Sequence, residues 1–229
     1  MAHLDPDSGR LCLHVVYDGA PRSGKTTTIR ALAKRRGLQV ETPEERDGRT
    51  VYFDWLDVQG GQVLGRPIQC RIIAVPGQDA LVARRAAILE GADVVIFTVD
   101  TGRGHVASSR RHFEELLTIL EARPRPIPVL TQLNKRDADD AVALRELREL
   151  FGKGSTHLLE TIATDDEGLQ EAFALGVGEA VRALQSSQLL EAGGPAASLP
   201  DEVDLRSPYS LLERLLDQRK PSASGGDSP

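Results

Sequence analysis

The stretch from Gly19 to Thr26 carries residue types that can hold phosphate. It reads Gly-Ala-Pro-Arg-Ser-Gly-Lys-Thr and fits the pattern GxxxxGK[ST] without a mismatch. In such a loop the backbone N–H groups converge on the anion, and the helix that follows adds its N-terminal dipole. Lys25 is expected to reach the outer phosphates, and the hydroxyl of Thr26 to hold magnesium. The stretch therefore predicts a nucleotide-phosphate site.

A Gly-Ser turn that caps an ordinary helix can have the same residues, so the flanking sequence decides between the two interpretations. Residues 11–17 form an apolar run typical of a buried strand, and residues 27–36 have the pattern of a helix. A strand, this loop and a helix in succession is the arrangement in which the pattern binds phosphate. We therefore favour the phosphate loop.

A second motif, Asn134-Lys135-Arg136-Asp137, follows another apolar run and selects a base. The carboxylate of Asp137 can accept from the two ring-side N–H groups of guanine, which adenine does not offer. Asn134 and the stem of Lys135 would hold the ring. Alone, this tetrapeptide can be a solvated turn. Its position about one hundred residues after the phosphate loop favours guanine binding.

The segment 160–164, Glu-Thr-Ile-Ala-Thr, resembles the ETSAK element that contacts the guanine oxygen. Ala163 stands at the position of the backbone donor. Thr164 replaces the lysine, so this match carries less weight than the other two motifs. It predicts a third segment near the base.

Composition excludes several classes of protein. The chain has 229 residues and a formal net charge of -6, which gives no basic face for nucleic acid. No apolar run approaches the length of a membrane span, and the first residues lack the blocks of a signal peptide. Cys12 and Cys70 are expected to be buried thiols. We expect a cytoplasmic protein.

Strand and helix patterns alternate along the chain, which predicts an α/β fold with a doubly wound, mostly parallel six-stranded sheet flanked by helices. The ligand is expected at the carboxyl ends of the strands. Gly60 and Gly61 are expected to form the turn of a hairpin. Strands are expected over 11–17, 50–58, 69–75, 93–100, 129–130 and 157–161, and helices over 27–36, 80–90, 109–122, 141–151 and 168–184.

The ends of the chain differ in composition from its centre. We expect a flexible N-terminus over 1–9, one domain over 10–185, a linker over 186–206, a short amphipathic helix over 207–220 and a disordered tail over 221–229. The leucine stripe from Leu211 to Leu216 fits equally a helix folded back on the domain and a docking helix for a partner.

With these motifs, roughly residues 10–185 resemble the Ras-like small GTPases, and more narrowly the bacterial MglA-type branch of gliding motility and cell polarity. The resemblance is carried by Arg49-Thr50 with residues 51–56, by Ala74-Val75-Pro76-Gly77-Gln78, and by residues 134–137. Ordinary small GTPases have DxxG where this chain has Ala74 to Gly77. The missing aspartate is typical of the MglA type. The resemblance implies a P-loop NTPase fold, the small GTPase G domain.

The resemblance also implies roles for the two segments near positions 50 and 77. Thr50 would meet magnesium and the γ-phosphate, and the N–H of Gly77 would meet that phosphate. Gln78 would orient the attacking water, and Arg49 would supply positive charge in place of an arginine finger. The alternative for Arg49 is a solvated surface arginine. Asp54 is a candidate for the missing carboxylate near the metal.

The expected ligands are GTP or GDP with Mg²⁺, and the expected partners are a roadblock-type activator and downstream effectors. The catalytic candidates are Gln78 and Arg49, and the metal ligands are Thr26, Thr50 and Asp54. The nucleotide-binding residues are expected to be Gly19, Ser23, Gly24, Lys25, Thr26, Thr27, Thr50, Gly77, Asn134, Lys135, Asp137 and Ala163.

Two functions from different classes fit these residues. The first is a molecular switch that binds and slowly hydrolyses GTP. The second is a GTP-dependent scaffold with little hydrolysis, which recruits a partner through its C-terminal helix. A third, a P-loop kinase, lacks a candidate lid and acceptor site. Pro21 has no N–H to offer and Arg22 adds a charge, so we expect altered hydrolysis rather than lost binding.

Overall fold

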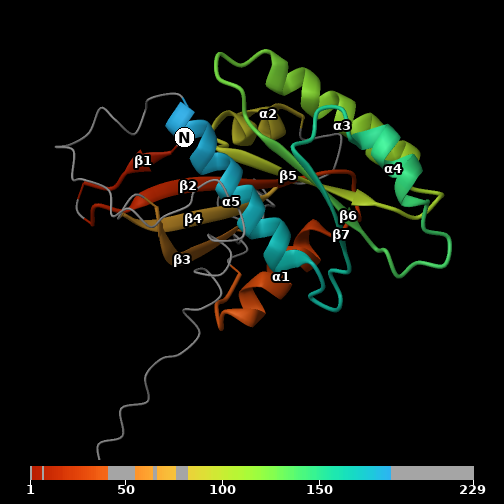
Figure 1. Ribbon diagram of the computed structural model, residues 1–229, viewed down its shortest axis with the longest axis horizontal. Helices are drawn as coiled ribbons and strands as arrows, with labels where there is room; N and C mark the ends of the chain where they lie inside the picture. Colours follow the sequence, from red (N-terminus) through yellow and green to blue (C-terminus); the bar gives the residue numbers. More distant parts are fainter. Residues whose placement is uncertain (1, 7, 41–54, 64–65, 76–81, 187–229) are drawn as a thin grey trace, which may run out of the picture.

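The computed structural model describes residues 2–6, 8–40, 55–63, 66–75 and 82–186 (Figure 1). Strands and helices alternate through most of these residues, as expected. The strands are β1 (His3–Leu4), β2 (Leu11–Asp18), β3 (Trp55–Val63), β4 (Arg66–Ala74), β5 (Val94–Asp100), β6 (Val129–Asn134) and β7 (His157–Thr161). The helices are α1 (Lys25–Arg35), α2 (Val82–Glu90), α3 (Val106–Glu121), α4 (Leu144–Phe151) and α5 (Leu169–Ser186).

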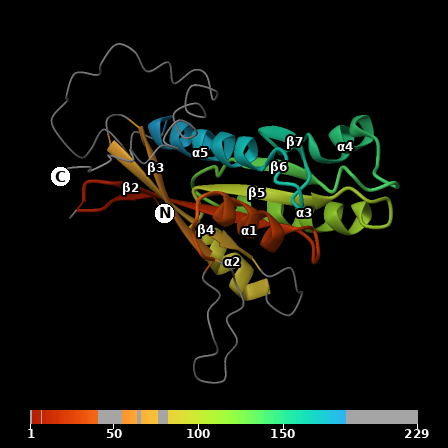
Figure 2. The same ribbon diagram turned by 90° about the horizontal axis from the view of Figure 1, so that it is seen from below.

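Six strands form the main path of the sheet, in the order β3-β4-β2-β5-β6-β7. Strands β4, β2, β5, β6 and β7 pair in parallel, and β3 pairs antiparallel with β4. Figure 2 shows the β3–β4 hairpin inclined steeply to β5. The expected six-stranded, mostly parallel α/β sheet is confirmed.

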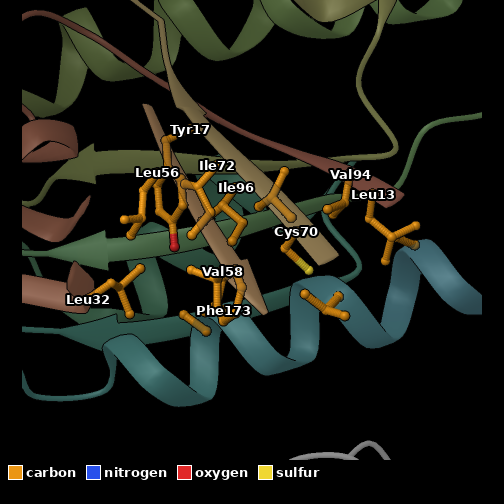
Figure 3. Packing of buried hydrophobic residues seen from close by; sticks show 14 of the residues in the cluster. Leu13, Tyr17, Leu32, Leu56, Val58, Cys70, Ile72, Val94, Ile96 and Phe173 are labelled. Carbon is orange, nitrogen blue, oxygen red and sulfur yellow. The ribbon is translucent and has the colours of Figure 1, made fainter. Parts of the chain in front are cut away.

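Two apolar cores lie on opposite faces of the sheet. On one face, α1 and α5 cover β2, β4 and β5. Figure 3 shows part of this core, in which Phe173 of α5 lies near Val58 of β3. On the other face, α2, α3 and α4 pack against β5 and β6. Burial on both faces explains why every residue of β5 is buried and why five of its seven residues are apolar.

The hairpin differs from the expectation in where it turns. Gly60 and Gly61 lie inside β3, at a shift of register between Gln59 and Gln62, and β3 continues to Val63. Glycine in a strand often marks such a bulge, because an extra residue must be accommodated without a side chain to pack. The glycine pair therefore marks an irregularity in the strand, and the expected turn at this position is wrong.

Part of the segment expected to be a flexible N-terminus is paired. His3 and Leu4 form β1, antiparallel to the start of β2. The backbone N–H of Ala2 donates to Asp93 Oδ1 over 2.8 Å, and the N–H of His14 donates to Asp93 Oδ2 over 2.9 Å. Arg125 completes the pairing of this buried carboxylate. These contacts hold residues 2–4 to the amino edge of the sheet.

Candidate nucleotide-binding site

Three loops that follow parallel strands lie at one edge of the sheet: the loop after β2, the loop after β6 and the residues after β7. This edge holds the carboxyl ends of the strands, where ligands bind in doubly wound folds. The first loop depends on two glycines with positive φ, 141° at Gly19 and 109° at Gly24. A Cβ at Gly19 would overlap the backbone oxygen of Thr98, and one at Gly24 would overlap the side-chain amide of Asn134.

The middle of the first loop lies at the surface. Pro21 and Arg22 are exposed, and Arg22 has a φ of 63°, which an L-residue with a Cβ adopts at a cost of about 1 kcal/mol. Ser23 is buried, and its N–H donates to the oxygen of Ala20 over 3.3 Å. A positively charged side chain therefore stands on the exposed part of the candidate phosphate loop.

Lys25, at the start of α1, turns back over the loop. Its ammonium group donates to the backbone oxygens of Gly19 and Ala20, each over 2.8 Å. An ammonium group has three donors, so one remains for an anion. Burial lowers the pKa of Lys25 to about 8, and the nearby Asp18 carboxylate opposes this shift only in part. The lysine is positioned by the loop itself.

The N-terminus of α1 has the features of an anion site. Gly24 precedes the helix and no side chain caps it, and the first turn has no acidic residue. The N-terminal N–H groups and the positive end of the helix dipole therefore favour a bound anion. Thr26 is half-buried and Thr27 exposed, whereas Thr28 is buried, and its hydroxyl accepts from the amide of Gln132 over 3.0 Å.

Asn134, at the end of β6, joins the three loops. Its amide nitrogen donates to the oxygen of Ser23 over 2.9 Å. Its side-chain oxygen accepts from the N–H of Ala163 over 3.0 Å and from the hydroxyl of Thr161 over 3.3 Å. The motif expected to hold guanine is thereby connected both to the phosphate loop and to the segment after β7.

The neighbours of Asn134 are held by a second set of contacts. The ammonium group of Lys135 pairs with Asp100 Oδ2 over 2.6 Å, and the hydroxyl of Thr101 donates to the oxygen of Asn134 over 2.8 Å. Lys135 has a φ of 63°. Asp137 is exposed, so its carboxylate is accessible to a ligand.

The backbone N–H of Ala163 has a partner within the protein. Its N–H, which the sequence assigns to the guanine oxygen, donates to Asn134 within the structure. One N–H can be shared between two acceptors, so a guanine oxygen would compete with or share this bond. The segment after β7 has its expected place beside the second motif, but its donor already has a partner.

A magnesium ion fits part of this site. The hydroxyl of Thr26 is a hard oxygen ligand at the first turn of α1, and magnesium is bound typically by few protein oxygens together with phosphates. Among the residues that the structure describes, no group of three or more His, Cys, Asp or Glu side chains has a metal-binding arrangement. Ala74, at the position of the missing aspartate, is buried at the end of β4.

Several expected residues lie outside the described ranges. They include the catalytic candidates Arg49 and Gln78 and the metal-ligand candidates Thr50 and Asp54. They also include the phosphate contact Gly77 and residues 187–229, which hold nearly all of the linker and the helix and tail that follow it. Their roles stay predictions.

One buried ion pair beside the phosphate loop was not expected from the sequence. Arg85 of α2 contacts both carboxylate oxygens of Asp18, the residue that precedes Gly19. The two residues are 67 positions apart, and no spacing rule relates them. A carboxylate that ends an apolar strand was the only available signal, because such a group requires a partner when it is buried.

The chain is similar in sequence to a known protein. No protein-family model matches the chain. The chain is 28% identical over 177 residues to the mutual gliding-motility protein MglA of Myxococcus xanthus (strain DK1622), a match that covers 74% of this chain and 90% of that protein. No helix in the described part of the chain is long and apolar enough to cross a membrane.

Proposed function

We propose that this chain, an MglA-type member of the Ras-like small GTPases, is a molecular switch that binds GTP with magnesium and hydrolyses it slowly to GDP and phosphate. Bound GTP would order the segments around Thr50 and Gly77, hydrolysis would release them, and a partner would recognise the difference. These two segments supply the proposed contacts to the γ-phosphate.

One observation carries this proposal: Asn134 connects the candidate guanine loop, the phosphate loop and the segment after β7. A solvated turn would not need a buried amide with three partners on two other loops. The proposal assigns the base to Asp137, whose exposed carboxylate accepts from guanine, and the ring to Asn134 and Lys135. Ala163 would share its N–H with the base.

The proposed phosphate contacts come from the first loop and α1. The remaining N–H of Lys25, the N-terminal N–H groups of α1 and the small residues Gly19, Ser23 and Gly24 would surround the phosphates. Thr27, at the first turn, would add a hydroxyl. Thr26 and Thr50 would hold magnesium, with Asp54 as a further candidate. When bound, the ion neutralises charge that develops on the phosphates.

The proposed hydrolysis uses two side chains from the segments near positions 50 and 77. Gln78 would orient the attacking water, and Arg49 would stabilise the charge of the transition state from within the chain. We expect a rate on the order of 10⁻⁴ to 10⁻² per second without an activator, as for small GTPases without or with an arginine in cis.

The cellular role is proposed from the relative, and the partners are proposed from the resemblance to MglA-type proteins. Its name assigns that protein to gliding motility, and we propose a role in bacterial cell polarity or motility for this chain. A roadblock-type activator and downstream effectors are the proposed partners. An activator would raise the rate of hydrolysis, and an effector would bind only the GTP form.

Identification of bound nucleotide tests the proposal directly. The purified chain should release guanine nucleotide on denaturation, and Asp137→Asn should shift its preference from guanine towards xanthine, because the amide reverses one hydrogen-bond match. Asp139→Asn, at a neighbouring exposed position, should leave the preference unchanged. Adenine nucleotide alone, or no binding of GTP, would refute the proposal.

The scaffold alternative is favoured by the buried Ala74 at the position of the missing carboxylate. It predicts GTP binding with almost no phosphate release. Single-turnover phosphate release, with and without an activator, separates the two functions. Turnover that falls in Arg49→Ala and Gln78→Ala but persists in Arg46→Ala, a control in the same sequence segment, would exclude the scaffold.

A further inference from the structure

We propose that Arg85 is a positioning residue for the bound nucleotide: it neutralises the Asp18 carboxylate at the entrance of the phosphate loop, so that a negatively charged phosphate can bind beside it. The inference rests on the proposed function, since it concerns how the same site holds its nucleotide. It assigns a role to two residues that the proposed binding and hydrolysis steps do not use.

The ion pair between Arg85 and Asp18 is buried, and the guanidinium contacts both carboxylate oxygens. Arg85 Nε lies 3.2 Å from Asp18 Oδ1 and 3.1 Å from Oδ2, and Nη2 lies 2.8 Å from Oδ2. Only 9% of the Arg85 side chain and 2% of the Asp18 side chain are exposed. A planar guanidinium that contacts both oxygens of a carboxylate has a fixed orientation, and it stays positively charged.

The rest of the guanidinium contacts α3. Nη1 pairs with Glu115 Oε2 over 3.0 Å, and Nη2 also donates to the backbone oxygen of His112 over 2.9 Å. The charge of Asp18 together with that of Glu115 outweighs burial and raises the pKa of Arg85 above its ordinary value. One side chain therefore connects α2, α3 and the end of β2.

The charge of the pair acts on the phosphate site. Asp18 is followed by Gly19, whose oxygen accepts from Lys25, and both Asp18 and Arg85 influence the charge state of that lysine. A buried carboxylate without its partner would repel a polyphosphate at short range and in a low dielectric. Pairing with Arg85 removes that repulsion.

Three variants test the inference through the rate at which fluorescent GDP leaves the full chain in excess GDP. Arg85→Gln should release it at least tenfold faster, because the carboxylate is left without its partner. Asp18→Asn should release it no faster than the wild type. The double variant should return to within threefold of the wild type, because removing both charges restores neutrality.

A merely structural role predicts a different pattern. Both single variants would then release GDP faster, in proportion to their loss of stability in urea, and the double variant would be at least as fast as either; that pattern overturns the inference. If Arg85→Gln does not fold, the rate of GDP release from Asp18→Asn tests the inference instead. A tenfold faster release from this isosteric variant would contradict the charge argument.

Arg145→Gln is the matched control, because Arg145 pairs with Glu149 on the exposed surface of α4 over 3.3 Å. It should release GDP at the wild-type rate. Failure of the wild type to bind GDP would refute the proposed function itself. Normal binding with no effect of Arg85→Gln would refute only the role of the ion pair.

Discussion

The side-chain amide of Asn134 donates to the backbone oxygen of Ser23 over 2.9 Å, between residues 111 positions apart in the sequence. This bond joins the end of β6 to the loop after β2. It means that the candidate base site and the candidate phosphate site form one unit, so a change in either loop is expected to alter the affinity for the whole nucleotide.

Asn134→Ala should weaken GDP binding by at least tenfold and destabilise the fold by roughly 2–3 kcal/mol, because three hydrogen bonds worth about 1 kcal/mol each are lost. Equilibrium binding of fluorescent GDP and unfolding in urea would measure the two effects. Thr118→Ala removes a hydrogen bond on the exposed side of α3. It should leave both the GDP affinity and the free energy of unfolding close to their wild-type values. Wild-type affinity in Asn134→Ala would contradict the connection.

Gly24→Ala should abolish or strongly reduce nucleotide binding. A Cβ at this position would overlap the amide of Asn134, and the φ of 109° is itself unfavourable for alanine. Gly37→Ala is the control, since Gly37 also has a positive φ, 65°, but a Cβ there would meet no atom within 4 Å. Isothermal titration with GDP should detect the loss only at Gly24. Equal losses in both variants would show that backbone strain alone is responsible.

Nucleotide affinity should fall with rising pH around the pKa of Lys25. Burial lowers this pKa to about 8, and a bound phosphate favours the charged lysine, so above pH 8 the protein must take up a proton to bind. The expected fall in GDP affinity between pH 7 and pH 9 is about tenfold. Lys25→Arg, whose guanidinium stays charged over this range, should give a weaker but flat profile. A flat profile in the wild type would contradict the shift.

Phe113→Ala should destabilise the fold without changing base preference. The ring of Phe113 lies 5.0 Å from that of Phe97 and 5.5 Å from that of Phe151, between centroids, in the core that α3 and α4 share with β5. Loss of a buried phenylalanine costs about 3–5 kcal/mol. Unfolding in urea would measure this cost, and the ratio of GDP to ADP affinity should remain that of the wild type. A changed ratio would show that this core shapes the base site.

Much of the architecture could be predicted from the sequence, because burial on both faces produces the mostly apolar sequence of β5 and burial of one face produces the periodicity of α3. The phosphate loop could also be predicted, since its glycines and lysine are close in sequence. The irregularity at Gly60 and Gly61 inside β3 could not be predicted, because glycine is typical both of a turn and of a bulge.

The contacts between distant side chains could not be predicted. The pairing of Arg85 with Asp18 depends on how α2 lies against the end of β2, and no local pattern encodes that position. The bond from Ala163 to Asn134 is a similar case, because the motif places the N–H beside the base but does not reveal a competing acceptor within the protein.

The register shift in β3 has a consequence for self-association. Among the described strands, β3 is outermost on its side of the sheet, and an outer strand with a regular row of N–H and C=O groups is a template for pairing with another molecule. The shift between Gln59 and Gln62 interrupts that row. Replacing Gly60 and Gly61 by β-branched residues would favour a regular outer strand, and with it aggregation of otherwise folded protein.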